Sequence, residues 1–248
     1  NQVFALADSL EPGRVVLDLR DNMGGNGALN RYPVQQILRR PWLDRADRLF
    51  VIIGRRTFSA GQQFANLLEA WTQATFVGEP TGQRPSQYGD HRPLELHNSH
   101  LTVMISTVFH QAPDEFDGRE FIPPDAYAPL TSEMYRRGDD PAVAAALSWK
   151  AGPAVADSVA ALVTTGDSAA AERLLRSVQQ QPVNRYRSLE AEINALGYRL
   201  LGSGAAAQAV TVFRINTQVY PHSANAFDSL GEALVTTGQR DAGIAAYR

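Results

Sequence analysis

The first candidate for chemistry is Ser59, which lies in the segment TFSAGQ at residues 57–62. Residues 49–53 before it form a short β-branched, apolar run typical of a buried strand, and a helical pattern begins at Gly61. A serine on a sharp strand-to-helix turn is exposed at a sheet edge, where the helix dipole stabilises negative charge. The backbone N–H of Ala60 would then help to bind an oxyanion. The alternative is that Ser59 only caps the helix, a common role for serine.

The second candidate is the pair Gly24 and Gly25, which follows an expected strand at residues 14–19. Two adjacent glycines let backbone N–H groups turn toward one point, as in oxyanion holes and anion nests. The alternative is a tight turn that needs positive φ angles. The segment is not a phosphate-binding loop, because the pattern GxxxxGK[ST] is absent.

Strand-like and helix-like segments alternate through the first half of the chain. The expected strands cover residues 14–19, 49–53, 75–78 and 101–107. A short helix is expected at 32–40, and a longer one from residue 61. The longer helix has Phe64, Leu67, Leu68 and Trp71 on one face. This order predicts an α/β fold with a mostly parallel sheet. Residues 78–93 are expected to form a long polar loop, and loops of that length are often functional.

The two candidate segments end successive strands, so their loops are expected to face each other across one sheet edge. A nucleophile opposite a loop of oxyanion donors is the minimum set of groups for acyl transfer. The pair therefore predicts acyl-transfer chemistry more strongly than either segment does alone.

The composition changes after residue 140 to one rich in alanine, leucine and glutamine. Residues 191–248 repeat at a spacing of 34, so that Leu196-Gly197 recurs as Leu230-Gly231 and Phe213 as Tyr247. This period resembles the tetratricopeptide repeat, which has two helices per unit. We therefore expect an α/β domain at 1–140 and a truncated all-α, tetratricopeptide-like region at 141–248.

Four motifs occur in the order found in one peptidase family: VVLDLRDNMGG, LFVIIGRRTFSAGQQFA, FVGEPTG and PPD at 123–125. Residues 1–130 thus resemble the C-terminal processing (tail-specific) serine peptidases, whose relatives include the tricorn core and the retinoid-binding-protein repeats. The resemblance implies a crotonase-like (ClpP/crotonase) α/β fold with Ser59 as nucleophile. It places the oxyanion hole at the backbone of Ala60 and of Gly24 or Gly25.

The sequence departs from that family at the general base. The processing peptidases have a lysine 25 residues beyond the serine, where this chain has Arg84, and the only lysine, Lys150, lies far from the motif. Arginine does not deprotonate at ordinary pH, so it cannot act as a base. The glutamate usually found three residues after the serine is Gln62 here.

The tricorn-like branch instead uses a histidine upstream of every residue of this sequence. By position in the chain, Asp117 or Glu120 could be the acid that orients it. The first and last residues also read as interrupted helices. We therefore expect a fragment that lacks its N-terminal part and its base, and that is inactive by itself.

Among the five histidines, His110 is the best base candidate within this chain, because it ends the strand-like run that begins at residue 101 (LTVMISTVF) and precedes a loop toward Asp117. The alternative is a surface histidine at a strand end. His91, His97 and His100 lack partner carboxylates at ligand spacing, so no metal site is expected.

Three side chains of the long loop, Arg84, Tyr88 and Asp90, could hold a substrate carboxylate, because arginine binds carboxylates bidentately. Such a site would suit an enzyme that recognises peptide C termini. The alternative is that Arg84 pairs with an acid of its own loop.

Composition excludes several classes of function. The 248 residues contain no cysteine, so disulfides, thiol catalysis and Cys-bound zinc are excluded. The net charge of −3 argues against a general nucleic-acid binder. No apolar run approaches the roughly 20 residues of a membrane helix.

These observations predict a serine-type peptidase that hydrolyses a peptide or protein substrate through an acyl-enzyme on Ser59, with no metal or organic cofactor. The helical repeats would bind a protein partner or deliver the substrate, and the resemblance implies an exported bacterial protein. One alternative is a catalytically inactive homologue that acts as a scaffold through its repeats. Another is an esterase, because nucleophile and oxyanion motifs do not reveal the leaving group.

Overall fold

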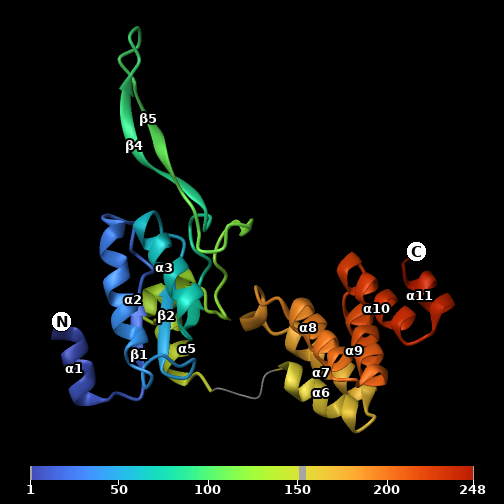
Figure 1. Cartoon of the computed structure of the whole chain (residues 1–248). Helices are drawn as coiled ribbons and strands as arrows, with labels where there is room; N and C mark the ends of the chain where they lie inside the picture. The colour runs from blue at the N-terminus through green and yellow to red at the C-terminus, as the bar shows by residue number, and fades with distance from the viewer. Residues whose placement is uncertain (1, 151–154, 248) are drawn as a thin grey trace. The chain divides into compact units, whose positions relative to one another are not determined.

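The computed structural model describes residues 2–150 and 155–247, and the chain divides into two compact units, residues 1–151 and 152–248 (Figure 1). The first unit extends beyond the expected boundary at residue 140 because helix α5 (Pro141–Ser148) packs against its sheet. Asp140 caps this helix and forms an ion pair with Arg20, and the Arg14 guanidinium donates hydrogen bonds to the carbonyls of Ala146 and Trp149.

The first unit is built on a four-stranded parallel sheet. Its strands lie in the order β1 (Val15–Asp18), β2 (Leu49–Ile53), β3 (Thr75–Gly78) and β6 (Ala126–Tyr127). Every residue of β2 is buried, which accounts for its continuous apolar sequence. The unit therefore has the mixed α/β class expected from its alternating segments.

Five further helical segments belong to the first unit: α1 (Gln2–Leu10), η1 (Gly27–Asn30), α2 (Arg31–Leu38), α3 (Ala60–Trp71) and α4 (Ser132–Arg137). Phe64 and Leu68 of α3 are buried in the core beside the strands. The expectation that Leu67 and Trp71 share this buried face was wrong for Trp71, which is 50% exposed, and Leu67 is only partly buried. The helix therefore keeps part of its apolar surface outside the core.

Two strands form an arm separate from the parallel sheet (Figure 1). β4 (Gln87–Glu95) pairs antiparallel with β5 (Thr102–His110). The strand expected at 101–107 is therefore present but does not join the parallel sheet, and much of the segment expected to be a loop forms β4. The polar sequence of β4 did not indicate a strand, because a strand that is solvated on both faces does not need apolar residues at alternate positions.

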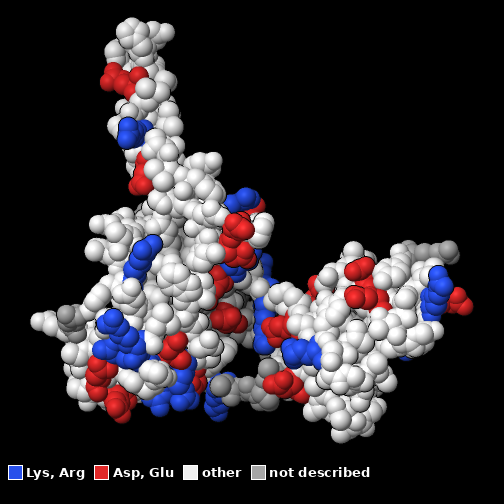
Figure 2. Space-filling model, in the orientation of Figure 1, with Lys and Arg blue, Asp and Glu red and all other residues white. Residues whose placement is uncertain are grey.

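The arm exposes apolar side chains along its length and carries few charges (Figure 2). On one face, the rings of Tyr88 and Phe109 lie 5.0 Å apart, and Leu94, Val103 and Ile105 continue the same face toward the tip. This apolar face has no cover within the described part of the first unit.

The second unit is helical. It comprises α6 (Val155–Thr164), α7 (Ser168–Gln179), η2 (Pro182–Asn184), α8 (Leu189–Gly202), α9 (Ala206–Val219), α10 (Ala224–Thr236) and α11 (Arg240–Ala246). Helices pack in consecutive pairs, α6 with α7, α8 with α9 and α10 with α11. Gly166, Gly204 and Gly238 occupy the three connecting turns with φ near +83°, a conformation that favours glycine.

The period of 34 residues corresponds to a repeated packing contact. A Cβ added to Gly197 of α8 would lie 2.4 Å from the ring of Phe213 in α9. A Cβ added to Gly231 of α10 would lie 2.7 Å from the ring of Tyr247. Each glycine thus admits an aromatic ring from the following helix, which brings the two helices of a pair close together.

We predict that Gly197→Ala lowers the stability of the second unit by about 1–3 kcal/mol, because the new methyl group overlaps the buried Phe213 ring. The measurement is urea unfolding followed by circular dichroism at the helix band. Gly202→Ala in the same helix is the matched control, because nothing lies within 4 Å of its Cβ position. It should leave stability unchanged or raise it by up to about 1 kcal/mol. An equal loss in both variants would contradict the packing argument.

Candidate active site

The backbone of Ser59 is held in an unusual conformation at the turn between β2 and α3. Its φ of 53° and ψ of −123° lie outside the regions that residues with a Cβ normally occupy. Its side chain makes no capping hydrogen bond to α3, so the capping role considered from the sequence does not apply. Strained residues of this kind persist only where their surroundings fix them, and they concentrate at functional sites.

Two glutamine side chains hold both backbone groups of Ser59. The Ser59 N–H donates to Gln83 Oε1 at 2.7 Å, and the Ser59 carbonyl accepts from Gln87 Nε2 at 3.0 Å. Both glutamines come from the segment that follows β3, and Asn66 of α3 fixes that segment by donating to the Pro85 carbonyl at 2.8 Å. These contacts supply the surroundings that keep the strained turn in place.

The loops after β1 and β2 are joined to each other, as the sequence predicts for loops at one sheet edge. Thr57 Oγ1, which is fully buried, donates to the Leu19 carbonyl at 2.8 Å. The Phe58 N–H donates to the Asn22 carbonyl at 3.0 Å. The Asn22 carbonyl also lies 2.3 Å from the position that a Cβ of Gly61 would take, so the glycine allows the approach.

These contacts between the two loops place Gly24 directly against Ser59, the nucleophile candidate. A Cβ on Gly24 would lie 2.6 Å from Ser59 Cβ and 3.1 Å from the Ala60 nitrogen. The Gly24 N–H already donates to Asn22 Oδ1 at 3.1 Å. Within the described residues, the N–H groups of Gly25 and Ala60 have no hydrogen-bond partner. Of the two glycines considered from the sequence, the geometry therefore favours Gly25 as oxyanion donor and gives Gly24 the role of close neighbour.

Ser59 opens into a cleft of about 900 Å³. It is lined by Ser59 and by residues of α3 from Ala60 to Trp71. Residues 25–28, 30 and 31 also line it, as do residues 109–113 at the root of the arm, together with Asp90. The cleft thus contains the nucleophile candidate, both free N–H groups and the histidine that the sequence favoured.

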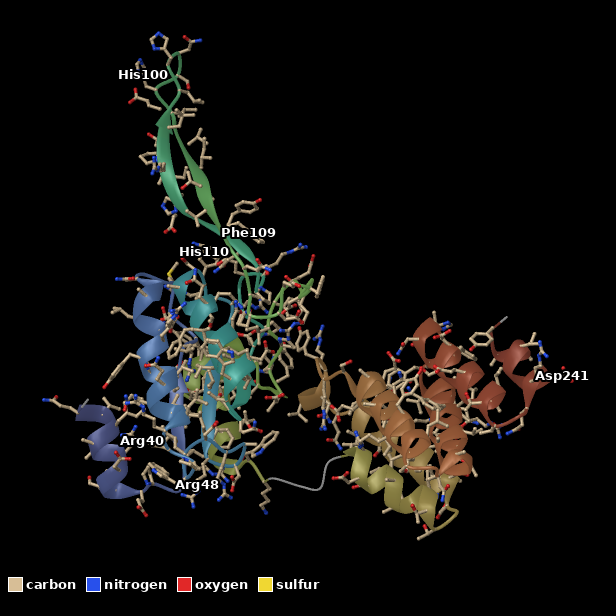
Figure 3. The ribbon with its side chains drawn as sticks, in the orientation of Figure 1. Arg40, Arg48, His100, Phe109, His110 and Asp241 are labelled. Carbon is tan, nitrogen blue, oxygen red and sulfur yellow. The ribbon has the colours of Figure 1, made fainter. Side chains whose placement is uncertain are left out.

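His110 lies at the root of the arm, as Figure 3 shows, and its ring is held by a carboxylate. Its Nε2 lies 3.1 Å from Asp90 Oδ2. By strand alternation, Asp90 and His110 would point to opposite faces of the arm, but Asp90 has a φ of +49° that turns its carboxylate toward the ring. Gln87, the cross-strand partner of His110, is the same residue that binds the Ser59 carbonyl.

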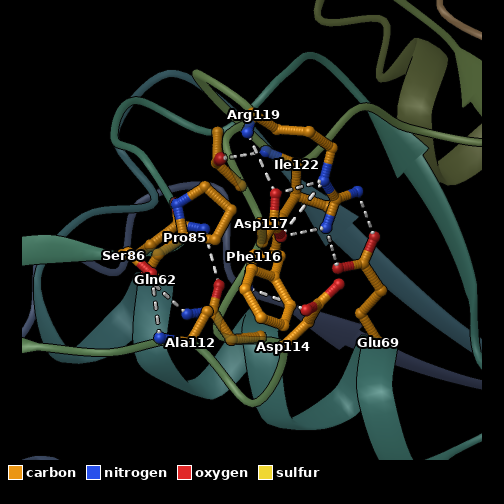
Figure 4. Close-up of polar contacts among 12 residues, drawn as sticks. Gln62, Glu69, Pro85, Ser86, Ala112, Asp114, Phe116, Asp117, Arg119 and Ile122 are labelled. Carbon is orange, nitrogen blue, oxygen red and sulfur yellow. Dashed lines mark hydrogen bonds and ion pairs between the residues drawn. The ribbon is translucent and has the colours of Figure 1, made fainter.

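The two acids proposed from the sequence are held by arginines instead. Asp117 accepts from Arg119 at 2.7 Å, and Arg119 also binds Glu69 (Figure 4). The hydrogen bonds from Arg119 lower the pKa of Asp117 below its usual value of 3.8. Asp117 and Arg119 line a separate pocket of about 420 Å³ that meets the cleft at Asn66, Ala112 and Pro113.

Arg84 and Glu120 form an exposed ion pair at 2.6 Å. Arg84 therefore pairs with an acid, but this acid lies 36 residues further along the chain and not in the loop of Arg84, as the alternative had it. Neither Arg84 nor Tyr88 lines the cleft, whereas Asp90 does so as the partner of His110. The three side chains therefore do not form the expected carboxylate site.

Gln62 is fully buried and donates to Asn66 Oδ1 at 3.0 Å. It thus helps to position Asn66 for its hydrogen bond to the Pro85 carbonyl. Among the described residues, no group of three or more His, Asp or Glu side chains is placed to hold a metal ion. Within the same residues, no helix combines the length and apolar character needed to cross a bilayer.

Comparison of the sequence with protein-family models and with curated proteins finds no match.

Three positioning residues escaped the sequence analysis. Gln83 and Gln87 carry no signal of their own, because glutamine in a polar loop is ordinary, and their contacts with Ser59 span more than twenty residues. Asp90 was noted only as a carboxylate that could help to hold substrate. Its sequence neighbours give no hint of a φ above zero, which only the folded arm reveals.

We predict that Gly24→Ala destabilises the first unit by at least about 2 kcal/mol, because alanine would need a φ of +114° and its methyl group would overlap Ser59. Tryptophan fluorescence during urea unfolding measures this, since Trp42, Trp71 and Trp149 all belong to the first unit. Gly13→Ala is the control, because its Cβ position is open. A Gly24→Ala protein as stable as this control would show that the contact with Ser59 is not tight.

A second prediction concerns the pH dependence of the Asp117 network. Because the pKa of Asp117 is lowered on folding, its carboxylate stabilises the folded state above pH ~4, and this contribution is lost as the pH falls through the folded-state pKa. Asp117→Asn should therefore cost about 1 kcal/mol at pH 7, with a difference from wild type that is smaller at pH ~3.

Urea unfolding of both proteins at the two pH values measures this difference. Asp21→Asn removes an exposed carboxylate and is the control, with an expected change below about 0.5 kcal/mol. A loss for Asp117→Asn that does not vary with pH would assign its effect to packing rather than to charge.

Proposed function

We propose that this chain carries the active site of a serine hydrolase, a serine-type peptidase, with Ser59 as the nucleophile. The observation that supports it most directly is the strained backbone of Ser59 at the start of α3. Both backbone groups of this residue are bound by side chains, and its hydroxyl is left without a capping role. If this position served only to form a turn, we would expect glycine there, because glycine adopts such a backbone conformation without strain.

The groups around Ser59 suit acyl transfer. Attack of Ser59 Oγ on a substrate carbonyl would place negative charge on the carbonyl oxygen. The free N–H groups of Gly25 and Ala60 are the donors available to bind that oxyanion, and the N-terminus of α3 adds favourable electrostatics. No metal or organic cofactor is needed for this step.

His110 is the proposed general base. Asp90 engages its Nε2, which leaves Nδ1 to accept the Ser59 proton and then to deliver it to the leaving group. A water molecule would complete the cycle by attacking the acyl-enzyme. Within the described residues, Ser59 Oγ and the ring share no hydrogen bond. Catalytic contacts of this kind often tighten only when substrate binds.

The finer fold assignments are part of the same proposal. The parallel sheet with Ser59 at its edge fits a crotonase-like core, and the paired helices with their 34-residue glycine–aromatic contacts fit tetratricopeptide-like repeats. The repeats would bind a protein partner or present the peptide or protein substrate. The upstream histidine of the tricorn-like branch is the competing source of the base.

Labelling with a fluorophosphonate tests the nucleophile and its base. The sequence alone led us to expect an inactive chain, but His110 and Asp90 line the cleft of Ser59, so we now expect the chain to be labelled. Ser59→Ala should remain unlabelled, and His110→Ala should react at least about 100-fold more slowly, the usual size of a general-base effect. Asp90→Asn should slow labelling by at least about tenfold, because the ring loses its orienting carboxylate.

His97→Ala is the matched control, because His97 lies between the strands of the arm at its tip and outside the cleft. It should react at the wild-type rate. Labelling that depends on Ser59 but not on His110 would transfer the base to another group of this chain. No labelling of the chain would overturn the hydrolase with His110 as its base and favour the scaffold.

A further inference from the structure

Ser59, which directly precedes α3, and three side chains of α3 line the cleft at intervals of four residues. The three are Gln63, Leu67 and Trp71, and Ala60 and Asn66 of α3 also line it. Residues four apart on a helix lie one above the other on the same face, about 6 Å apart along the axis. These residues form a stripe about 18 Å long along the axis that winds partly around α3, by about 40° at each step, with the nucleophile at one end and an indole ring at the other.

The spacing of this stripe matches an extended peptide. Side chains on one side of an extended chain repeat every two residues, or about 6.6–6.8 Å, which is close to the helical step of about 6 Å. A peptide lying along α3 would therefore place alternate side chains against successive members of the stripe. The distance from Ser59 to Trp71 corresponds to about five extended residues.

The chemistry of the stripe also suits a peptide. The Gln63 carboxamide is half-buried and has no hydrogen-bond partner among the described residues, so it keeps a donor and an acceptor for a peptide group. Leu67 is partly buried and Trp71 is 50% exposed, although α3 buries its other large apolar side chains. Phe109, also about half exposed, faces the same cleft from the root of the arm.

We propose that this cleft binds an extended peptide along α3, with Leu67 and Trp71 as subsites for apolar side chains that lie up to about five residues from the reacting carbonyl. The proposal rests on the assignment of Ser59 as nucleophile and adds the subsites that would select the side chains of the peptide. An ester with a small acyl group would occupy only the Ser59 end of the stripe and would leave Trp71 uncovered.

Binding to the Ser59→Ala chain tests the site without catalysis. The probes are a fluorescein-labelled octapeptide of alternating leucine and serine, its isomer with the leucines and serines in pairs, and the labelled dipeptide Leu-Ser. Fluorescence anisotropy should show the alternating octapeptide binding at least about tenfold more tightly than either other probe, a difference that corresponds to one well-filled subsite.

Trp71→Ala, added to Ser59→Ala, should weaken binding of the alternating octapeptide by about tenfold and leave the dipeptide unchanged. Trp71→Phe should retain binding within about threefold, because it keeps an aromatic ring. Tyr135→Ala is the matched control, because Tyr135 is an exposed aromatic on α4 outside the cleft. Unfolding midpoints of all variants verify that the first unit remains folded.

The possible failures are distinguishable. Equal binding of the three probes, or binding that Trp71→Ala does not weaken, would overturn the peptide site, while fluorophosphonate labelling of Ser59 would still support a hydrolase for small acyl groups. Peptide binding that depends on Trp71, together with absent labelling of the full chain, would overturn the hydrolase and retain the peptide site.

Discussion

The candidate site depends on the two glutamine side chains that hold the backbone of Ser59. A φ of 53° costs free energy for any residue with a Cβ, so it must be offset by contacts that a relaxed turn would lose. Gln83 and Gln87 supply these contacts from the segment after β3, and Asn66 anchors that segment to α3. The position of the hydroxyl is thus set by three parts of the chain that meet only in the folded domain.

The same contacts connect the nucleophile candidate to the arm. Gln87 is the first residue of β4 and faces His110, the last residue of β5. One side chain therefore couples the serine turn to the strand pair that carries the histidine and its carboxylate. The cleft lies between these elements, so the first unit positions its proposed nucleophile, base and oxyanion donors around a single opening.

The local sequence was sufficient to predict much of the core of the first unit, but not the arm. The buried run of β2 and the serine and glycine motifs at the sheet edge are encoded within a few residues, and the structure brings Ser59 and Gly24 together as predicted. β4 could not be recognised, because its polar residues reflect a strand solvated on both faces. The roles of Asp90, Gln83 and Trp71 arise from contacts between distant segments or from a backbone angle, neither of which leaves a periodic pattern.

The arm also has a consequence for the behaviour of this chain in solution. Within the described residues, β4 and β5 pair only with each other, so each strand keeps one edge whose backbone N–H and C=O groups have no strand partner. Open edges of this kind, flanked by exposed Val103 and Ile105, are templates for intermolecular strand pairing. The arm is therefore the part of the first unit where self-association would begin as protein concentration rises, and a charged side chain on its apolar face would oppose it.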